Sequence, residues 1–358
     1  MPTIGPVSVL SSNERTDCET IMTQPIGGNS VAQPQTVEHI LKRYAMPLQI
    51  SRDRIIADLR NAPATAVLTE YFQAGKRFRA LLAFVGASAI GIEPSTIIPV
   101  AAALELLHGA SLIHDDIADE AAERRTLSAL HVQIGIGPAL VLGDYLILRA
   151  FMVLQELQEV YGLEKTCEAS RALNSYAQAC CRGEFHELLP TGAGNPEDEY
   201  LTIVQGKTAS QFAAAVTLPA IIGGATSRDI EALQTYGLNV GTAFQIQDDV
   251  LDLVGDSRVL GKPIGNGLVN ARLLLPLIYL ERYGSPAARR EYSQMQHAET
   301  STLVHLANLL KEEGILVRIG LTQNRYLSAG LQALDQLRPS DDRDALSVLA
   351  TYAVHRHA

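Results

Sequence analysis

Three aspartates, Asp115, Asp116 and Asp119, stand close together after an apolar, alanine-rich segment. That segment, Ile97 to Leu107, has the composition of a buried helix. If the helix continues, offsets of one and four bring all three carboxylates to one edge within about a turn. Like charges at these offsets repel one another by roughly 0.2–0.5 kcal/mol per pair on an exposed helix. The pattern therefore indicates that a cation binds beside this helix.

Two adjacent arginines, Arg124 and Arg125, follow shortly after the aspartates. Guanidinium groups form paired hydrogen bonds with phosphate oxygens, whereas carboxylates bind metal ions. The close succession of the two residue types suggests a site for a metal ion and a phosphate group.

The same aspartate spacing recurs far along the chain, at Asp248, Asp249 and Asp252. A single cluster of this kind is most often a solvated acidic face of a helix. Two clusters, each set among apolar residues, favour a functional interpretation in which their helices face each other across a bundle. The carboxylates would then require divalent cations, and ligation by oxygen alone suits Mg²⁺.

The elements that must position these clusters are helices. From Gln35 onward apolar residues recur with helical spacing, and the sequence contains no convincing strand pattern. We predict one all-α domain over residues 34–358, a bundle of about ten or more helices, one of which covers residues 164–188. Residues 1–33 are rich in Ser, Thr, Gly, Pro and Asn without periodicity, so we expect them to form a mobile tail.

Composition and charge argue against several classes of protein. The chain has 358 residues, 47% of them hydrophobic, a net charge of −10 and a pI of about 5.4, which disfavours nucleic acid as a partner. Its four cysteines show no metal-binding spacing. We identify no apolar run of the roughly 18 residues needed to span a bilayer and no secretory leader, so we expect a cytoplasmic protein without a transmembrane segment.

Over residues 40–357 the chain resembles the trans-isoprenyl diphosphate synthases, the polyprenyl synthetase family, and especially its geranylgeranyl and longer-chain members. The matching motifs, in order, are Gly75-Lys76-Arg77-x-Arg79, His108, Asp-Asp-x-x-Asp at 115–119, Arg124-Arg125, Gly143-Asp144, Lys207-Thr208, Phe244-Gln245 with Asp-Asp-x-x-Asp at 248–252, and Gly261-Lys262-Pro263. The resemblance implies a single large helical bundle of the isoprenoid synthase type around a deep apolar cavity, usually as a homodimer. It also implies a magnesium-dependent prenyltransferase that condenses isopentenyl diphosphate with an allylic diphosphate in isoprenoid biosynthesis.

The resemblance also implies roles for individual residues. Three Mg²⁺ ions are expected between the two aspartate clusters and the allylic diphosphate, with Asp115, Asp119 and Asp248 as the most direct ligands. The cations expected to neutralise the leaving group are Arg124, Lys207 and Lys262. Those expected to bind isopentenyl diphosphate without metal are Lys76, Arg79, His108 and Arg125. Dipoles expected to stabilise the allylic cation, in a cavity that offers no water, come from Lys207, Thr208 and Gln245.

The chain departs from the family pattern just after each aspartate cluster. Thr126 follows the arginines where the family has Gly, and Gly267, Ala271 and Leu274 replace Asp, Gly and Thr after the second cluster. Arg272 stands at the position of a family lysine and is predicted to replace it at the diphosphate. Two alternatives therefore stay open: a relative of the terpene cyclases acting on a prenyl diphosphate, and a non-catalytic partner subunit of a heteromeric synthase. The second is the weaker alternative, because non-catalytic partners generally lose an aspartate cluster and this chain keeps both.

Small side chains precede the first aspartates on the wall expected to line the cavity. Ala110 lies five residues before Asp115 and is followed by Ser111. In short-chain members of the family a bulky aromatic residue there blocks chain growth. Ala110 leaves room, so we predict products of about twenty carbons or more. Glu184 and Glu187 are interpreted as polar residues at the rim of the cavity.

Overall fold

The computed structural model describes residues 35–73, 75–124, 127–190, 192, 194–255, 265–269, 272–295 and 300–355. The predicted tail of residues 1–33 lies outside the described residues. So do the predicted site residues Arg125 and Lys262, and the departures at Thr126 and Ala271.

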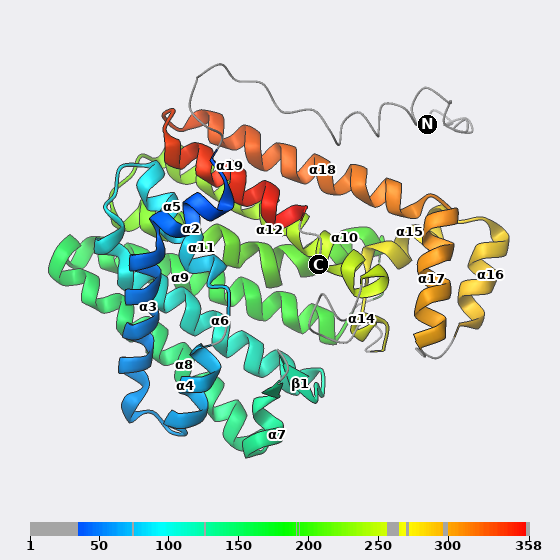
Figure 1. Cartoon of the computed structure of the whole chain (residues 1–358), viewed down its shortest axis with the longest axis horizontal. Coiled ribbons are helices and arrows are strands. Elements are labelled where there is room, and N and C mark those ends of the chain that lie inside the picture. Colours follow the sequence, from blue (N-terminus) through cyan, green and yellow to red (C-terminus); the bar gives the residue numbers. More distant parts are fainter. Residues whose placement is uncertain are drawn as a thin grey trace. The chain divides into compact units, whose positions relative to one another are not determined.

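Helices make up most of the described chain (Figure 1). The α-helices are α2 (Val37–Arg43), α3 (Ala45–Asp58), α4 (Thr65–Gln73), α5 (Phe78–Ala89), α6 (Ile98–Ala118), α7 (Leu130–Ile134), α8 (Ile136–Leu154), α9 (Gln158–Leu188), α10 (Pro196–Val204), α11 (Ser210–Ile222), α12 (Ser227–Val254), α14 (Asn266–Val269), α15 (Leu275–Tyr283), α16 (Pro286–Gln294), α17 (Thr300–Glu312), α18 (Ile315–Ala333) and α19 (Asp341–Val354). Short 3-10 turns are η1 (Leu59–Asn61), η2 (Pro94–Ile97), η3 (Gln155–Leu157) and η5 (Leu334–Gln336), and η4 (Gln205–Ala209) is a π-helix. The described strands are β1 (Glu123–Arg124) and β2 (Leu127–Ser128), an antiparallel pair. The predicted all-α class is confirmed.

Local sequence explains where two of the long helices begin. The side chain of Thr226 caps α12 by accepting the N–H of Asp229 at 3.2 Å. The helix predicted from residue 164 corresponds to α9, in which Gly162 has a φ of 80° and interrupts the helical backbone. The regular part of α9 therefore starts close to the predicted position, because glycine adopts this left-handed conformation without steric cost.

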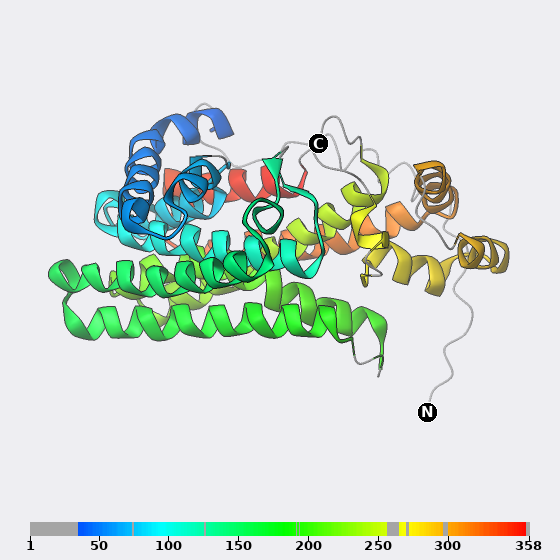
Figure 2. The ribbon, with the colours of Figure 1, turned by 90° about the horizontal axis from the view of Figure 1, so that it is seen from below.

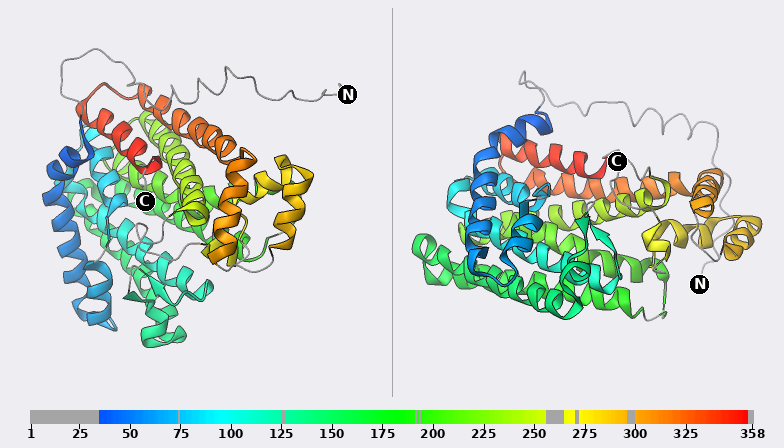
Figure 3. Two further views of the ribbon diagram at one scale, coloured as in Figure 1. Left: turned by 45° about the vertical axis from the view of Figure 1, so that its right-hand side comes forward. Right: turned by 60° about the horizontal axis from the view of Figure 1, so that its bottom comes forward.

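Helix α11 lies at the centre of the bundle, and almost all of its residues are buried. It packs against α5, α9 and α12, while α6 packs against α5 and α8. Figure 2 shows α8 and α9 running beside each other along one side of the bundle. In Figure 3, α16 and α17 lie at the opposite end from α3 and α4. This packing brings the ends of α6 and α12, where both aspartate clusters stand, next to the same central helices.

Glycines allow α12 to pack at short distance against η4 and α11. A Cβ on Gly237 would lie 2.4 Å from the Cα of Ala213, and one on Gly241 would lie 2.6 Å from the Cα of Ala209. Any side chain at these positions would force the helices apart. The second aspartate cluster continues along α12 from this contact, so its position relative to η4 and α11 is fixed by backbone packing.

Two helical stretches of the described chain are long and apolar enough, by length and composition, to cross a membrane: Pro94–Ala118 and Ile136–Leu188. The sequence-based expectation of no such stretch was therefore too strict. The first is 61% buried inside the bundle, as a core helix of a folded domain is. The second stretch combines α8 and α9, and 33% of its most apolar 18-residue window is buried. Either feature alone is weak evidence for a membrane span.

Candidate active site

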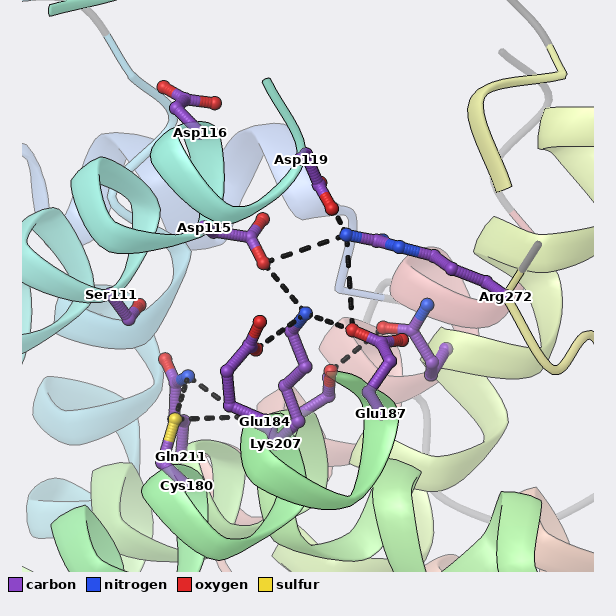
Figure 4. A network of polar contacts seen from close by, with 12 residues as sticks. Ser111, Asp115, Asp116, Asp119, Cys180, Glu184, Glu187, Lys207, Gln211 and Arg272 are labelled. Carbon is purple, nitrogen blue, oxygen red and sulfur yellow. Dashed lines mark hydrogen bonds and ion pairs between the residues drawn. The ribbon is translucent and has the colours of Figure 1, made fainter. Parts of the chain in front are cut away.

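The first aspartate cluster divides its carboxylates between two sides of α6. In Figure 4, Asp115 and Asp119 point into a network of polar side chains, and Asp116 points away from it. Asp116 is 1% exposed, and Arg124 Nε donates to its two carboxylate oxygens at 2.6 and 2.7 Å. The Arg124 Nη2 atom also lies 3.5 Å from Asp115 Oδ2. Arg124 therefore links the β1 strand to both sides of the cluster.

Lys207 occupies the centre of the polar network (Figure 4). Its Nζ lies 2.6 Å from Asp115 Oδ1 and 2.7 Å from Glu184 Oε2, and it also pairs with Glu187. Burial by itself would lower the pKa of Lys207, but the carboxylates of Asp115 and Glu187 outweigh it and raise that pKa. Burial likewise opposes ionisation of Asp115, yet Lys207 and Arg272 lower its pKa. Lysine and aspartate are both charged here.

Arg272 reaches the same network from the segment that precedes α15. Its guanidinium pairs with Asp119 and lies 3.7 Å from Asp115 Oδ1 and 3.8 Å from Glu187 Oε2. The backbone N–H of Arg272 donates to the Gly267 carbonyl at 2.8 Å, so Arg272 is anchored to α14 through its main chain. The structure thus places the predicted lysine replacement among the first-cluster carboxylates, and its role toward a diphosphate stays a prediction.

In the second aspartate cluster, neutral side chains donate hydrogen bonds to one of the carboxylates. Asp249 accepts from the Tyr200 hydroxyl at 2.6 Å and from Gln245 Nε2 at 2.9 Å. Burial raises the pKa of Asp249 to about 7, although both hydrogen bonds favour its ionised form. Asp252 accepts the backbone N–H of Gly267 at 2.8 Å, so α14 contacts this cluster. Asp248 is half-buried.

The two clusters are joined through the π-helix η4. Lys207, which contacts Asp115, is followed by Thr208, whose hydroxyl donates to Gln245 Oε1 at 2.8 Å. Gln245 in turn donates to Asp249. A Cβ on Gly183 of α9 would lie 2.4 Å from the backbone nitrogen of Lys207, so α9 supports η4 at backbone distance. The sequence-predicted residues Lys207, Thr208 and Gln245 thus form one connection between the clusters.

The residues predicted to bind isopentenyl diphosphate lie on neighbouring elements. Lys76 is exposed just before α5, and Arg79 lies in the first turn of α5 with its guanidinium carbon 5.6 Å from the centre of the Phe212 ring. His108 is half-buried on α6, which packs against α5. Their grouping around one diphosphate stays a prediction. So do the metal-ligand roles of all six aspartates and the chain-length roles of Ala110, which is fully buried, and Ser111.

Glu184 and Glu187, which were predicted to lie at the rim of the cavity, contact Lys207 inside the polar network. One oxygen from each, together with one from Asp115, lies within 4.8 Å of the others, which is close enough to share a metal ion. Both glutamates follow Gly183 on α9, so the close packing of that glycine brings them to Lys207. Spacing alone could not assign them to this site, because their partners lie on α6 and η4.

Comparisons with known proteins agree with this geometry. Residues 62–312 match the polyprenyl synthetase family. The short chain isoprenyl diphosphate synthase of Methanothermobacter thermautotrophicus is 32% identical over 79% of this chain and 86% of its own. The octaprenyl diphosphate synthase of Haemophilus influenzae is 29% identical over 90% of this chain and 98% of its own. Among solved structures, a polyprenyl synthase from Caulobacter crescentus, complexed with calcium and isoprenyl diphosphate, superposes with a TM-score of 0.81 at 27% identity, over 91% of this chain and all of that one.

Proposed function

The chain belongs to the polyprenyl synthetase family and is a trans-prenyltransferase, and we propose that it joins isopentenyl diphosphate to an allylic diphosphate by magnesium-assisted ionisation. We further propose an all-trans product of about twenty carbons or more, since Ala110 and Ser111 leave room for a long chain. The observation that carries the proposal is the continuous connection between the two aspartate clusters through Lys207, Thr208 and Gln245.

The donor set fits magnesium. Asp115, Asp119 and Asp248 offer hard carboxylate oxygens, with no sulfur or imidazole ligand among them, and Mg²⁺ prefers such oxygens together with substrate phosphates. We propose these three as the ligands of up to three ions. Asp116 and Asp249 would instead orient the clusters, because Arg124 and Tyr200 already bind them. When bound, Mg²⁺ supplies Lewis-acid stabilisation of charge on the departing diphosphate.

The chain's own cations would hold the leaving group. Lys207, Arg272 and Arg124 are paired with carboxylates in this structure. A diphosphate offers anionic oxygen acceptors as a carboxylate does, and it carries more charge, so we propose that it takes over these cations when it binds. They then stabilise the negative charge that develops as the allylic C–O bond breaks.

The second substrate would be held on the α5 side of α6. Lys76, Arg79 and His108 carry the donors for the diphosphate of isopentenyl diphosphate, and we propose that Arg125 and Lys262 contribute to the two diphosphates as the family pattern implies. The double bond of this substrate attacks the allylic cation to form the new C–C bond. The proton lost in that step passes to the released diphosphate. The side-chain dipoles of Thr208 and Gln245 face the cation.

The protein is also proposed to act as a homodimer. Helix α8 carries a row of exposed apolar side chains at helical spacing, with Val141 at 62%, Leu148 at 66% and Met152 at 58% exposure. Exposed apolar rows of this kind mark contacts with another surface. A second copy of α8 would cover the row symmetrically.

The direct test is incubation of the purified protein with labelled isopentenyl diphosphate, allylic primers of increasing length and Mg²⁺. Elongated diphosphates support the proposal, and their length tests the product range. A released hydrocarbon or alcohol would instead support the cyclase alternative. No product from the protein alone, with product appearing only when another subunit is added, would support the partner-subunit alternative.

A further inference from the structure

Gln211, in the first turn of α11, has a polar side chain at a position that the reaction described above does not use. Its Nε2 donates to the main-chain carbonyl of Lys207 at 2.9 Å and lies 3.4 Å from Cys180 Sγ. The Cys180 thiol also approaches the Lys207 carbonyl, at 3.5 Å. These contacts fix which end of the amide is nitrogen, because a flipped amide would place two carbonyl oxygens together.

The other end of the amide, Oε1, is buried and has no hydrogen-bond partner among the described residues. A buried amide oxygen without a partner costs about 1–3 kcal/mol, so its presence requires a reason. Leucine would fill a similar volume without this cost. The polar group is therefore maintained at the expense of stability, as is common where a dipole serves a ligand.

The position of the amide indicates which ligand it serves. In Figure 4, Gln211 stands beside Cys180, next to the Lys207 network, and its amide is directed toward the side of the site where Ser111 of α6 lies. Thr208, whose side-chain dipole is proposed to face the allylic cation, lies with Lys207 on the preceding turn. On this placement, Oε1 of Gln211 lies beside the position where the hydrocarbon chain of a bound allylic diphosphate would join its diphosphate group.

We propose that Gln211 is a further catalytic residue, whose Oε1 dipole stabilises the allylic cation; this inference rests on the proposed function. When the allylic C–O bond breaks, both bonding electrons leave with the diphosphate, and the carbon becomes positive. The negative end of the Gln211 carbonyl dipole faces that carbon, while its donation to the Lys207 carbonyl holds the amide in place. No proton or electron is transferred to Gln211, and the cation is consumed by the isopentenyl double bond.

The test compares binding of two probes by isothermal titration calorimetry, in the presence of Mg²⁺ and pyrophosphate where the probe lacks a diphosphate. One probe is an ammonium analogue of the allylic cation, and the other is a neutral-chain allylic thiolodiphosphate. Gln211→Leu should bind the ammonium analogue at least about tenfold more weakly and the thiolodiphosphate unchanged. Gln178→Leu, an exposed glutamine on α9, is the matched control and should bind both probes as the wild type does.

Two results would overturn the inference. Equal weakening of both probes in Gln211→Leu would show that the residue only supports the site structure, and unchanged binding of both would show that it has no role. If Gln211→Leu does not fold, Gln211→Met is measured in the same way after its thermal unfolding has been checked. Failure of the wild type to bind the thiolodiphosphate would count against the proposed function itself and not against Gln211.

Discussion

Asp115 and Asp116 are adjacent, yet they have different surroundings and should respond differently to substitution. Asp115 contacts Lys207 inside the polar network, whereas Asp116 binds Arg124 on the other side of α6. Asp115→Asn should lower kcat/KM by about 10²-fold or more with little change in stability, because it removes charge from the reacting site. Asp116→Asn should mainly lower the free energy of unfolding, by about 1–3 kcal/mol, since the half-buried Arg124 then loses the charged partner of its hydrogen bonds.

Urea unfolding and steady-state kinetics on both variants check this division of roles. Thr202→Ala, at an exposed position on α10, should leave both quantities unchanged. If Asp116→Asn lost activity at full stability, Asp116 would have to be treated as a reacting-site residue like Asp115.

The Cys180 thiol should react slowly below alkaline pH. Burial raises its pKa to about 11, so only a small fraction is thiolate at pH 8, and that fraction grows as the pH approaches 11. In wild-type protein, iodoacetamide followed by peptide mass spectrometry should label the exposed Cys181 before Cys180 at pH 8. An allylic substrate analogue should slow Cys180 labelling further. Equal labelling rates for the two cysteines at pH 8 would contradict the raised pKa of the Cys180 thiol.

The length of the product should depend on Ala110. It is fully buried on α6, so a phenylalanine there must project into whatever space lies between α6 and its neighbours. We expect Ala110→Phe to shorten the longest product by at least one isoprene unit, as seen by chromatography of the dephosphorylated products. Ser111→Ala removes little volume and should keep the wild-type length. An unchanged length in a folded Ala110→Phe variant would mean that another helix sets the limit.

At the scale of elements, the site depends on the contact between α9 and η4. A Cβ on Gly183 would meet the backbone nitrogen of Lys207 at 2.4 Å, and backbone cannot move as a flexible side chain can. Gly183→Ala should lower the free energy of unfolding by about 1–3 kcal/mol and reduce activity by displacing Lys207. Gly320→Ala on α18 is the matched control, because nothing lies within 4 Å of its added Cβ. It should be neutral or stabilise the protein slightly. A fully active and stable Gly183→Ala variant would show that η4 is not fixed by this contact.

Elements with a regular local pattern of apolar residues could be predicted from the sequence, and elements without such a pattern could not. Helical spacing of apolar residues predicted the helices that carry Asp115 and Asp248, because each buries one face on the bundle. The π-helix at Gln205–Ala209 has no such signature, and it lies where the backbone packs closely against Gly183 of α9. For the same reason Glu184 and Glu187 could be noticed but not placed beside Lys207. Long-range packing, and not composition, decides which polar side chains meet.

At the scale of the whole molecule, the exposed apolar row on α8 should control assembly. Leu148 is 66% exposed, so a charged residue there disturbs no internal packing but would be buried in a symmetric α8 contact. Leu148→Glu should therefore convert a dimer to a monomer without unfolding it, because two copies of the new charge would face each other across the two-fold axis. Analytical ultracentrifugation across a range of concentrations measures the change.

Val317→Glu, on the exposed face of α18, separates an interface effect from a general effect of added charge. Val317 is 51% exposed and has the same apolar character, but it lies on a different helix. If the dimer forms through α8, this variant keeps the wild-type assembly while Leu148→Glu loses it. A dimer that persists in Leu148→Glu and dissociates in Val317→Glu would show that the contact is formed by α18.

Helices α6 and α8 pack closely together, so the activity of monomeric Leu148→Glu should also show whether the α6 aspartates need the dimer to stay in position. Reduced kcat in the folded monomer would mean that they do.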